Sequence, residues 1–537
     1  MGMYEIVEKK RLELQNELDL EKSQKERNAL GQFATPLRLA NDIIDYILKN
    51  NFFVNETIRF LDPAIGTGAF FSAIINKSSN GNNSKIDSAM GIEIDVGFAE
   101  VSKKLWSDYG LQVITGDFTR IDPPQDNNEL ANLILTNPPY VRHHHIDKDT
   151  KKRLVKLIKN KFGYSINGLS GLYGYFLLLS HFWLREGGYG IWLVPSEFMD
   201  VNYGKTLKQY LTEQVTLLHI HRFDPNEVQF GDALVSSAIV VFRKEKPTTD
   251  TKILFTFGGS LLGPGTEQIA SIEEIKNHPK WTHFPTSHTD PVPNYNNETI
   301  RLKDLFKIKR GIATGNNKFF IMDKRKASAL SLPDEFLTPI LPGPRDLKED
   351  IIESDSEGNP LLNDQLVILN CDIPEQRIKT AYPELYNYLK SGELGGINNG
   401  YLLRKRNPWY KQEYREPAPF LCTYMGRSSR DKRPFRFIWN KSKAITANVY
   451  LLLYPTGEFA RALNKNHDLY KSVFEALNRV ESEELKGNGR VYGGGLHKIE
   501  PKELGNISAI NLLDILSSID FNILNQTKLS NWSRGNI

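Results

Sequence analysis

The feature that most constrains the fold of this chain is a series of short apolar runs between residues 37 and 241. Each run is rich in Ile, Val and Leu, and helix-length stretches separate the runs. The runs are IRFLDPAIG, KIDSAMGIEID, LQVITGDF, ANLILTNPPY, YGIWLVPSEF, VTLLHIHRF and SSAIVVFRK. Strands of this kind that alternate with helices are typical of a mainly parallel sheet covered on both faces. The sequence therefore predicts a doubly wound, Rossmann-like α/β domain.

The chain is long enough for more than one domain. Its 537 residues exceed what a single core usually holds, and 40% of them are hydrophobic, which is enough to build two cores. The polar segment 242–252, which contains Pro247, is the candidate linker. We therefore predict the α/β domain at residues 31–246 and an α+β domain at 247–537. Residues 1–30, in which Glu alternates with Lys and Arg, are predicted to form an exposed helical arm.

Hydropathy and cysteine content restrict the setting of the protein. No window of about 18 uncharged apolar residues occurs, and the N-terminal stretch is charged throughout. We therefore expect a cytoplasmic protein with no membrane contact. Cys371 and Cys422 are the two cysteines and stand far apart, which excludes a disulfide framework and a cysteine-based zinc site.

The end of the first predicted strand carries a glycine-rich turn. In open α/β sheets ligands bind beyond the carboxyl ends of the strands. The segment FLDPAIGTGAFF places Asp62 at the strand end, followed by Gly66 and Gly68. Glycines there let the backbone turn tightly and approach a ligand closely. A G-x-G pair is weak evidence alone, because a tight strand-to-helix turn would also explain it.

Acidic residues also end the second and third predicted strands. Glu93, in GIEID, can accept hydrogen bonds from ribose hydroxyls, and Asp117, in GDF, can accept one from an adenine amino group. Phe118 offers an apolar cover beside Asp117. Each acid could singly be a helix cap. On three successive strands, however, these residues describe a slot with the shape of adenosine.

A fourth strand delivers Asn-Pro-Pro-Tyr at residues 137–140, and with it the order of motifs resembles a known family. The chain looks like the S-adenosylmethionine-dependent amino-methyltransferases. It is most similar to the TaqI-type branch of the adenine-N6 DNA methyltransferases of type II restriction-modification systems. GQFATP (31–36) lies upstream of the glycine turn, and a large domain follows the catalytic motif, as in that branch. The likeness runs from about residue 31 to residue 510.

The resemblance implies S-adenosylmethionine as the cofactor and extends the set of binding residues. Thr35 matches a position that contacts the methionine moiety. Ile94 would lie against the adenine face, and Asp62 near the amino-acid end. The cofactor-binding residues predicted from the motifs and the resemblance together are Thr35, Asp62, Ala64, Gly66, Gly68, Glu93, Ile94, Asp117, Phe118 and Asn137.

The Asn-Pro-Pro-Tyr tetrapeptide suits methylation of an exocyclic amine. The amine is a poor nucleophile because its lone pair is delocalised into the ring. We expect the Asn137 side-chain oxygen and the Pro138 carbonyl to accept its hydrogens, while Pro138 and Pro139 keep the loop stiff. The base must first leave the duplex. Tyr140 would stack on the flipped adenine, and the family pattern suggests Phe230 as the opposing contact.

Basic residues predict a DNA-binding C-terminal half. Residues 404–443 contain 12 Lys/Arg against 3 Asp/Glu, with eight interleaved aromatic residues, a composition expected of a surface that binds phosphates and bases. A solvated basic face is the alternative. His143, His144 and His145 are expected to line the DNA cleft and to bind no metal. The predicted DNA contacts are Arg142, His143, Lys309, Arg310, Arg404, Lys405, Arg406, Arg427, Arg430 and Arg433.

Other functions remain open at this point. The expected activity is methylation of adenine N6 in a short specific sequence of double-stranded DNA, which a cognate restriction endonuclease cleaves separately. Cytosine-N4 methylation is the nearest alternative, although that group more often has Ser at the position of Asn137. Methyltransferases acting on ribosomal RNA or on a release factor are usually shorter. A non-enzymatic DNA-binding subunit would be expected to show a damaged tetrapeptide, and this one is intact.

Overall fold

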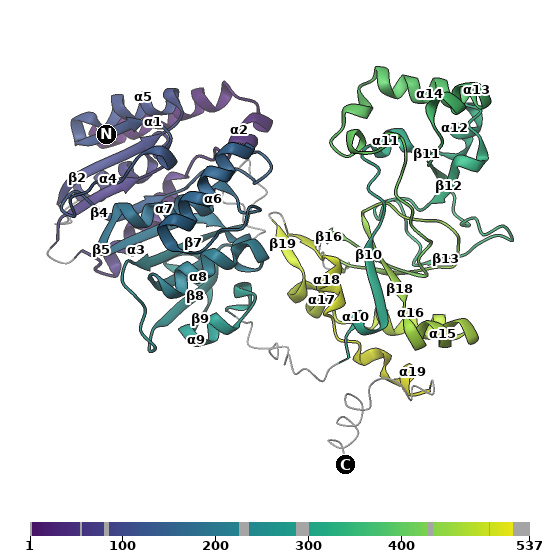
Figure 1. Ribbon diagram of the computed structural model, residues 1–537. Helices are drawn as coiled ribbons and strands as arrows, with labels where there is room; N and C mark the ends of the chain where they lie inside the picture. The colour runs from purple at the N-terminus through teal and green to yellow at the C-terminus, as the bar shows by residue number, and fades with distance from the viewer. Residues whose placement is uncertain are drawn as a thin grey trace, which may run out of the picture. The chain divides into compact units, whose positions relative to one another are not determined.

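The chain forms two compact units in a computed structural model (Figure 1). One unit comprises Met1–Pro291 with Tyr492–Gly494, and the other comprises Val292–Val491 with Gly495–Ile537. The structure describes residues 3–53, 56–79, 85–224, 236–285, 300–427, 433–492 and 495–518.

The first unit is built on a sheet that has nine strands within the described residues, in the order β3-β2-β1-β4-β5-β7-β6-β8-β9. The strands from β3 to β5 are parallel, and β7 runs antiparallel between β5 and β6. The strands are β1 (Ile58–Asp62), β2 (Ile86–Glu93), β3 (Leu111–Thr115), β4 (Ala131–Thr136), β5 (Leu184–Pro195), β6 (Thr216–Arg222), β7 (Ser237–Arg243), β8 (Lys252–Ser260) and β9 (Gly263–Ser271).

Two groups of helices cover this sheet. Helix α1 packs on α4 and α5, and α3 packs on α4, whereas α7 packs on α6 and on α8. The helices are α1 (Met3–Leu20), α2 (Gln24–Leu30), α3 (Leu37–Lys49), α4 (Ala69–Ser79), α5 (Val96–Trp106), α6 (Lys148–Phe162), α7 (Leu172–Ser180), α8 (Lys205–Glu213) and α9 (Ile272–Asn277). Every residue of β4 is buried, as expected of a strand covered on both faces. The predicted doubly wound α/β fold is confirmed.

The first unit extends further along the chain than the sequence predicts. The proposed linker at 242–252 joins two strands of one sheet, because β8 pairs in parallel with β6 and β9 pairs with β8. Phe255, Ile275 and Trp281 are buried in the core of the α/β unit. The first unit therefore ends at Pro291 rather than at residue 246.

The N-terminal residues do not form a separate arm. Helix α1 packs on α4 and α5 of the first unit, and its side chains Glu8, Arg11 and Gln15 are buried. The expectation of an exposed helix is therefore wrong. Its cause is the sparse apolar set in this segment, since periodicity identifies a packing face by its apolar residues.

The second unit combines three smaller sheets with short helices. Among its described residues the sheet orders are β10-β18-β15-β17-β13, β11-β14-β12 and β16-β20-β19. Its strands are β10 (Phe306–Arg310), β11 (Ile321–Asp323), β12 (Leu337–Ile340), β13 (Ile351–Ile352), β14 (Leu366–Leu369), β15 (Phe420–Thr423), β16 (Met425–Arg427), β17 (Phe437–Asn440), β18 (Tyr450–Pro455), β19 (Arg490–Tyr492) and β20 (Leu496–Lys498).

The helices of the second unit are mostly short. They are α10 (Leu302–Leu305), α11 (Asn317–Phe320), α12 (Lys324–Ala329), α13 (Glu375–Ala381), α14 (Pro383–Leu394), α15 (Gly457–Lys465), α16 (Leu469–Asn478), α17 (Ser482–Asn488), α18 (Pro501–Gly505) and α19 (Leu513–Ser518). The buried side chains of this unit gather in three clusters rather than one core. Within the described ranges, no helix of either unit is long and apolar enough to span a bilayer.

Candidate functional site

A cavity of about 470 Å³ lies at the carboxyl ends of β1, β2, β3 and β4. Residues of the 30–35 segment, of the glycine turn after β1 and of the loop after β4 line it, together with side chains from α1. Strand ends in a parallel sheet meet at one edge, so residues far apart in the sequence converge there. The site predicted from successive strand ends is therefore a single cavity in the structure.

The glycine turn after β1 is built by close packing on α5. Gly66 and Gly68 have φ angles of +56° and +87°, which side-chain-bearing residues rarely adopt. A Cβ on Gly68 would lie 2.5 Å from the Trp106 indole nitrogen, and that nitrogen donates to the Thr67 carbonyl at 2.9 Å. Gly68 thus shapes the turn without lining the cavity, whereas Gly66 lines it.

Two acids stand at the first two strand ends, of which Asp62 is buried and Glu93 is partly buried. Asp62 is 2% exposed, accepts the Ala64 N–H at 3.0 Å, and burial raises its pKa to about 7. Glu93 accepts the N–H groups of Gly66 and Asp95, each at 2.9 Å, and burial raises its pKa as well. Because a carboxylate has about four acceptor positions, Glu93 retains capacity for two ligand hydroxyls.

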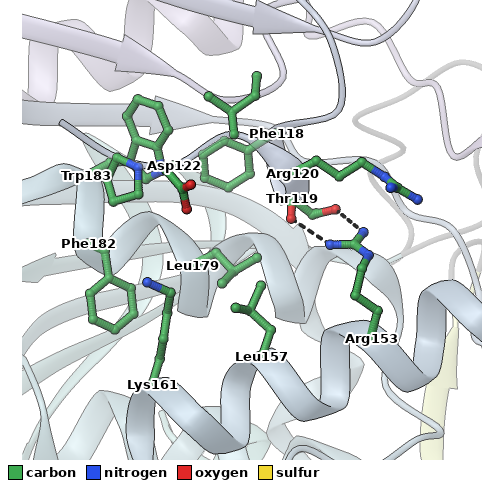
Figure 2. A pocket seen from close by; sticks show the side chains of 12 residues that line it. Phe118, Thr119, Arg120, Asp122, Arg153, Leu157, Lys161, Leu179, Phe182 and Trp183 are labelled. Atoms are coloured by element: carbon green, nitrogen blue, oxygen red, sulfur yellow. Dashed lines mark hydrogen bonds between the residues drawn. The ribbon is translucent and has the colours of Figure 1, made fainter.

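Asp117, at the third strand end, is held by a network that reaches α6. One Asp117 oxygen accepts the Thr119 N–H and hydroxyl at 2.9 and 2.7 Å, and the other accepts Arg120 Nε at 3.2 Å. Arg153 of α6 donates to the Thr119 carbonyl and hydroxyl, both at 2.7 Å (Figure 2). These contacts fix the carboxylate at the cavity wall.

The same segment separates the cavity from a second one of about 350 Å³. Phe118 and Thr119 line both cavities. Figure 2 shows the second cavity between this segment and helix α6, with Lys161 and Phe182 near one another on its wall. The Lys161 ammonium lies 4.6 Å from the Phe182 ring centre. Phe118 is buried against Phe176 and Trp183, which makes it a rigid partition.

Asn137, the first residue of the Asn-Pro-Pro-Tyr loop, has a defined amide orientation. Its Nδ2 donates to the Phe33 carbonyl at 2.9 Å and to Thr35 Oγ1 at 3.2 Å. Because a backbone carbonyl can only accept, the NH₂ end must face Phe33 and the oxygen must face away. Asn137 Oδ1 is buried and has no hydrogen-bond partner in the described structure. The loop therefore offers one free acceptor at the cavity.

The loop is anchored on both sides by backbone hydrogen bonds. The Tyr140 N–H donates to the Gly31 carbonyl at 3.1 Å, and the Leu172 N–H donates to the Val141 carbonyl at 2.9 Å. Gly31 has a φ of +66°, and a Cβ there would lie 2.4 Å from the Tyr140 nitrogen. This close approach explains why the 31–36 segment and the tetrapeptide occur together.

Of the two predicted stacking residues, Tyr140 and Phe230, the structure describes only Tyr140. The Tyr140 ring is 6% exposed, its hydroxyl donates to the Leu193 carbonyl at 3.1 Å, and its centre lies 5.6 Å from that of Phe33. The ring therefore has no open face in this structure. Phe230 lies outside the described residues. Stacking of a base between them stays a prediction.

Nearly all predicted cofactor-binding residues line the cavity, and Gly68 is the exception. Of the tetrapeptide, Asn137 and Pro139 line it. Sequence reasoning missed a group contributed by α1, namely Arg11, Gln15 and Asp19. Their signal was a polar stripe at helical spacing, which is easily taken for a solvated face.

The histidine loop is held in place by α6. Lys151 donates to the His143 carbonyl at 2.6 Å, and burial lowers the pKa of the His143 and His144 rings. His145 lines the cavity, and the Arg142 side chain is exposed. In the part of the chain that the structure describes, no three His, Cys, Asp or Glu residues gather as a metal site.

The basic run 404–443 is less free than its composition suggests. Arg406 donates to the carbonyls of Ala313 and Thr314 at 2.6 and 3.0 Å, and Arg433 donates to the Asn478 carbonyl at 2.8 Å. These bonds tie part of each guanidinium to the second unit, although Arg433 is exposed and Arg406 is half-buried. Their role as DNA contacts stays a prediction. Of the interleaved aromatics, five are buried in the core: Tyr410, Phe420, Tyr424, Phe435 and Phe437.

Other predicted DNA contacts lie on the surface of the second unit. Arg404, Lys405, Lys309 and Arg427 are exposed. The Lys405 ammonium lies 4.0 Å from the Tyr401 ring centre, and the exposed Arg310 guanidinium lies 4.2 Å from that of Tyr424. Arg430 lies outside the described residues.

The parallel-rich sheet, the cavity at its strand ends and the anchored Asn-Pro-Pro-Tyr loop are the arrangement expected of a methyltransferase catalytic domain. Comparison with known families gives two matches. The Eco57I restriction-modification methylase family matches residues 79–229, and the C-terminal domain of the type II methyltransferase M.Eco57I matches residues 287–531.

Characterised relatives match over most of their length. The chain is 28% identical to the type II methyltransferase M.AccI of Acinetobacter calcoaceticus over 91% of this chain and 87% of that protein. It is 27% identical to M.XamI of Xanthomonas campestris pv. amaranthicola over 88% and 84%. The solved structure of the type IIL enzyme MmeI with DNA aligns at a TM-score of 0.48 and 12% identity, over 82% of this chain and 60% of that one. Over these matched residues the chain is thus similar to type II restriction-modification methyltransferases such as Eco57I and M.AccI.

Proposed function

We propose that this protein transfers the methyl group of S-adenosylmethionine to N6 of an adenine in a short, specific sequence of double-stranded DNA. The modified site would then be protected from a cognate restriction endonuclease that acts separately. The observation that carries this proposal is the free, buried Oδ1 of Asn137 beside the cavity. An unpaired buried acceptor costs stability, so a substrate donor is the natural partner for it.

The acceptors at the strand ends suit the adenosine part of the cofactor. Glu93 has acceptor capacity for ribose hydroxyls, Asp117 is fixed where it can accept the adenine amino group, and the exposed Ile94 side chain offers an apolar face. Asp62 supplies a carboxylate for the amino-acid end. The cavity of about 470 Å³ is in the size range of small-molecule sites.

The Asn137 acceptor suits the chemistry of an exocyclic amine. Oδ1, together with the Pro138 carbonyl, accepts the two amine hydrogens and concentrates the nitrogen lone pair out of the ring plane. S-adenosylmethionine supplies a methyl group on a cationic sulfur, so the N–C bond forms as the S–C bond breaks and the surplus amine proton leaves afterwards. The loop's anchors at Gly31 and Leu172 keep this geometry fixed, which is the contribution of orientation to the rate.

Replacing Asn137 tests this role. We expect Asn137→Ala to lower methyl transfer to DNA by at least about 100-fold, as loss of a preorganised polar group in an active site does. Binding of S-adenosylhomocysteine should weaken far less than turnover, because Asp62, Glu93 and Asp117 remain and only the contact predicted for Asn137 is lost. Asn127→Ala, an exposed asparagine in the loop before β4, is the matched control. Wild-type turnover in Asn137→Ala would contradict the mechanism.

A further inference from the structure

Helix α1 buries polar side chains and exposes apolar ones. Glu8, Arg11 and Gln15 are 4%, 1% and 7% exposed, and they are the buried members among its described side chains. Leu12 and Leu20, by contrast, are 42% and 86% exposed. The buried residues are spaced by three and four positions, so they form one stripe along the helix. Tyr4 and Val7 also pack against the core, so the inward face of α1 combines apolar contacts with a buried polar stripe, unlike the usual amphipathic pattern.

The stripe is bonded to the glycine turn after β1. Arg11 donates to both Glu8 carboxylate oxygens at 2.8 and 2.6 Å, and to Thr67 Oγ1 at 3.0 Å. The Thr67 hydroxyl donates in turn to Gln15 Oε1 at 2.7 Å, and the Ser72 hydroxyl donates to Glu8. Thr67 lies between Gly66 and Gly68, so α1 is joined to the turn that shapes the cavity.

Arg11 has two N–H donors for which the described structure shows no bond. An arginine has five N–H donors, and the bonds to Glu8 and Thr67 use three of them. Arg11, Gln15 and Asp19 all line the cavity. A buried ion pair is costly to desolvate and can often be replaced by neutral side chains without loss of stability, so packing alone gives little reason for a charged pair here.

We propose that Arg11, with Gln15 beside it, binds the carboxylate of the amino-acid end of S-adenosylmethionine, which makes α1 part of the cofactor site. This rests on the proposed function. The cation of Arg11 and the carboxyl of Asp62 line the same cavity, and these opposite charges complement the carboxylate and ammonium of an α-amino acid. Glu8 holds the guanidinium in place, and Gln15 and Thr67 complete the contact with the glycine turn.

Two cofactor analogues test this assignment. S-adenosylhomocysteine keeps the amino acid, whereas 5′-methylthioadenosine lacks it, so their dissociation constants separate the two ends of the cavity. In the full-length double variant Glu8→Gln with Arg11→Met, S-adenosylhomocysteine should bind about 10- to 100-fold more weakly, the equivalent of one charge-assisted hydrogen bond. Binding of 5′-methylthioadenosine should change by less than about threefold. Lys10→Met, an exposed position on the same helix, should leave both constants unchanged.

A second variant covers the case in which the double variant fails to fold. Gln15→Leu keeps the Arg11–Glu8 pair and should weaken S-adenosylhomocysteine selectively by several-fold. Equal weakening of both analogues, or no change in either, would overturn the assignment and leave α1 a structural clamp. If S-adenosylmethionine is not the methyl donor, the wild-type protein itself should bind neither analogue. If only the target base is wrong, the wild type should bind both, and the nucleoside analysis of methylated DNA identifies that failure.

Discussion

The amide of Asn137 presents its oxygen to the cavity because its NH₂ end is occupied by Phe33 and Thr35. The sequence alone predicts a catalytic role for Asn137 through the tetrapeptide. It cannot predict the orientation, because Phe33 and Thr35 lie more than 100 positions away in the chain. Orientation of this kind depends on tertiary contacts, whereas the presence of the motif does not.

The neighbouring basic residues Arg404, Lys405 and Arg406 differ in whether their charged groups are exposed or hydrogen-bonded within the unit. Arg406 is half-buried and donates to two backbone carbonyls and to Gln412. Arg404 and Lys405 are exposed beside the Tyr401 ring. Composition assigns the same charge to all three residues. It does not show that the Arg406 guanidinium is already hydrogen-bonded to backbone carbonyls of the same unit. The surface available to phosphates is therefore smaller than the charge of the 404–443 run indicates.

Substitution of these neighbours should separate DNA binding from stability. We expect Arg404→Gln with Lys405→Gln to weaken DNA binding and to lower the slope of log affinity against log salt by about 2, because each phosphate contact contributes about 0.9. Arg406→Gln should instead lower the melting temperature, because it leaves buried carbonyls without a donor, and keep the slope. Fluorescence anisotropy of labelled DNA across a salt series gives the affinity and its slope, and thermal unfolding gives the melting temperature. An unchanged slope in the double variant would remove Arg404 and Lys405 from the interface.

Among the elements, α1 is the one whose packing face hydrophobic periodicity does not predict. The seven strands between residues 58 and 243 follow from their apolar runs, which central strands such as β4 need because they are buried on both faces, whereas the edge strand β3 is mostly exposed. Helix α1 packs through Glu8, Arg11 and Gln15, and a polar stripe carries no burial signal in an isolated sequence. Its packing face becomes visible only with Thr67 and Ser72 opposite it.

Helix α6 joins the loop after the tetrapeptide to the wall of the cavity that carries Asp117. Its N-cap residue Asp147 accepts two backbone N–H groups, Lys151 holds the His143 carbonyl, and Arg153 holds Thr119. Through Thr119, Arg153 positions the carboxylate of Asp117. The helix thereby connects two parts of the site.

Replacing Arg153 should change recognition of the adenine amino group. S-inosylhomocysteine, in which an oxygen replaces that group, cannot donate to Asp117, so we expect the wild type to prefer S-adenosylhomocysteine by about tenfold or more. Arg153→Met should reduce this preference at least about fivefold, since Asp117 loses its fixed position. Calorimetric titration of both analogues gives the ratio, with Lys156→Met, an exposed residue of α6, as the control. A preference equal to the wild type would show that Asp117 is positioned without Arg153.

For the whole molecule, sequence patterns identify the two units better than their boundary. Segment 242–252 is polar and contains a proline, so it has the composition of a linker. It lies within the first unit because β8 pairs with β6 across that segment, a long-range contact that leaves no local signal. The topology of the second unit does not follow from the sequence either, because its strands are short and its buried residues form three separate clusters.

The central claim, that the free acceptor of Asn137 serves an adenine amino group, is tested most directly by identifying the methylated base. The wild-type protein would be incubated with S-adenosylmethionine carrying a labelled methyl group and with unmethylated genomic DNA, which is then digested to nucleosides. The account predicts label in N6-methyladenine and none when Asn137→Ala replaces the wild type. Label in N4-methylcytosine, or no label in DNA, would contradict it.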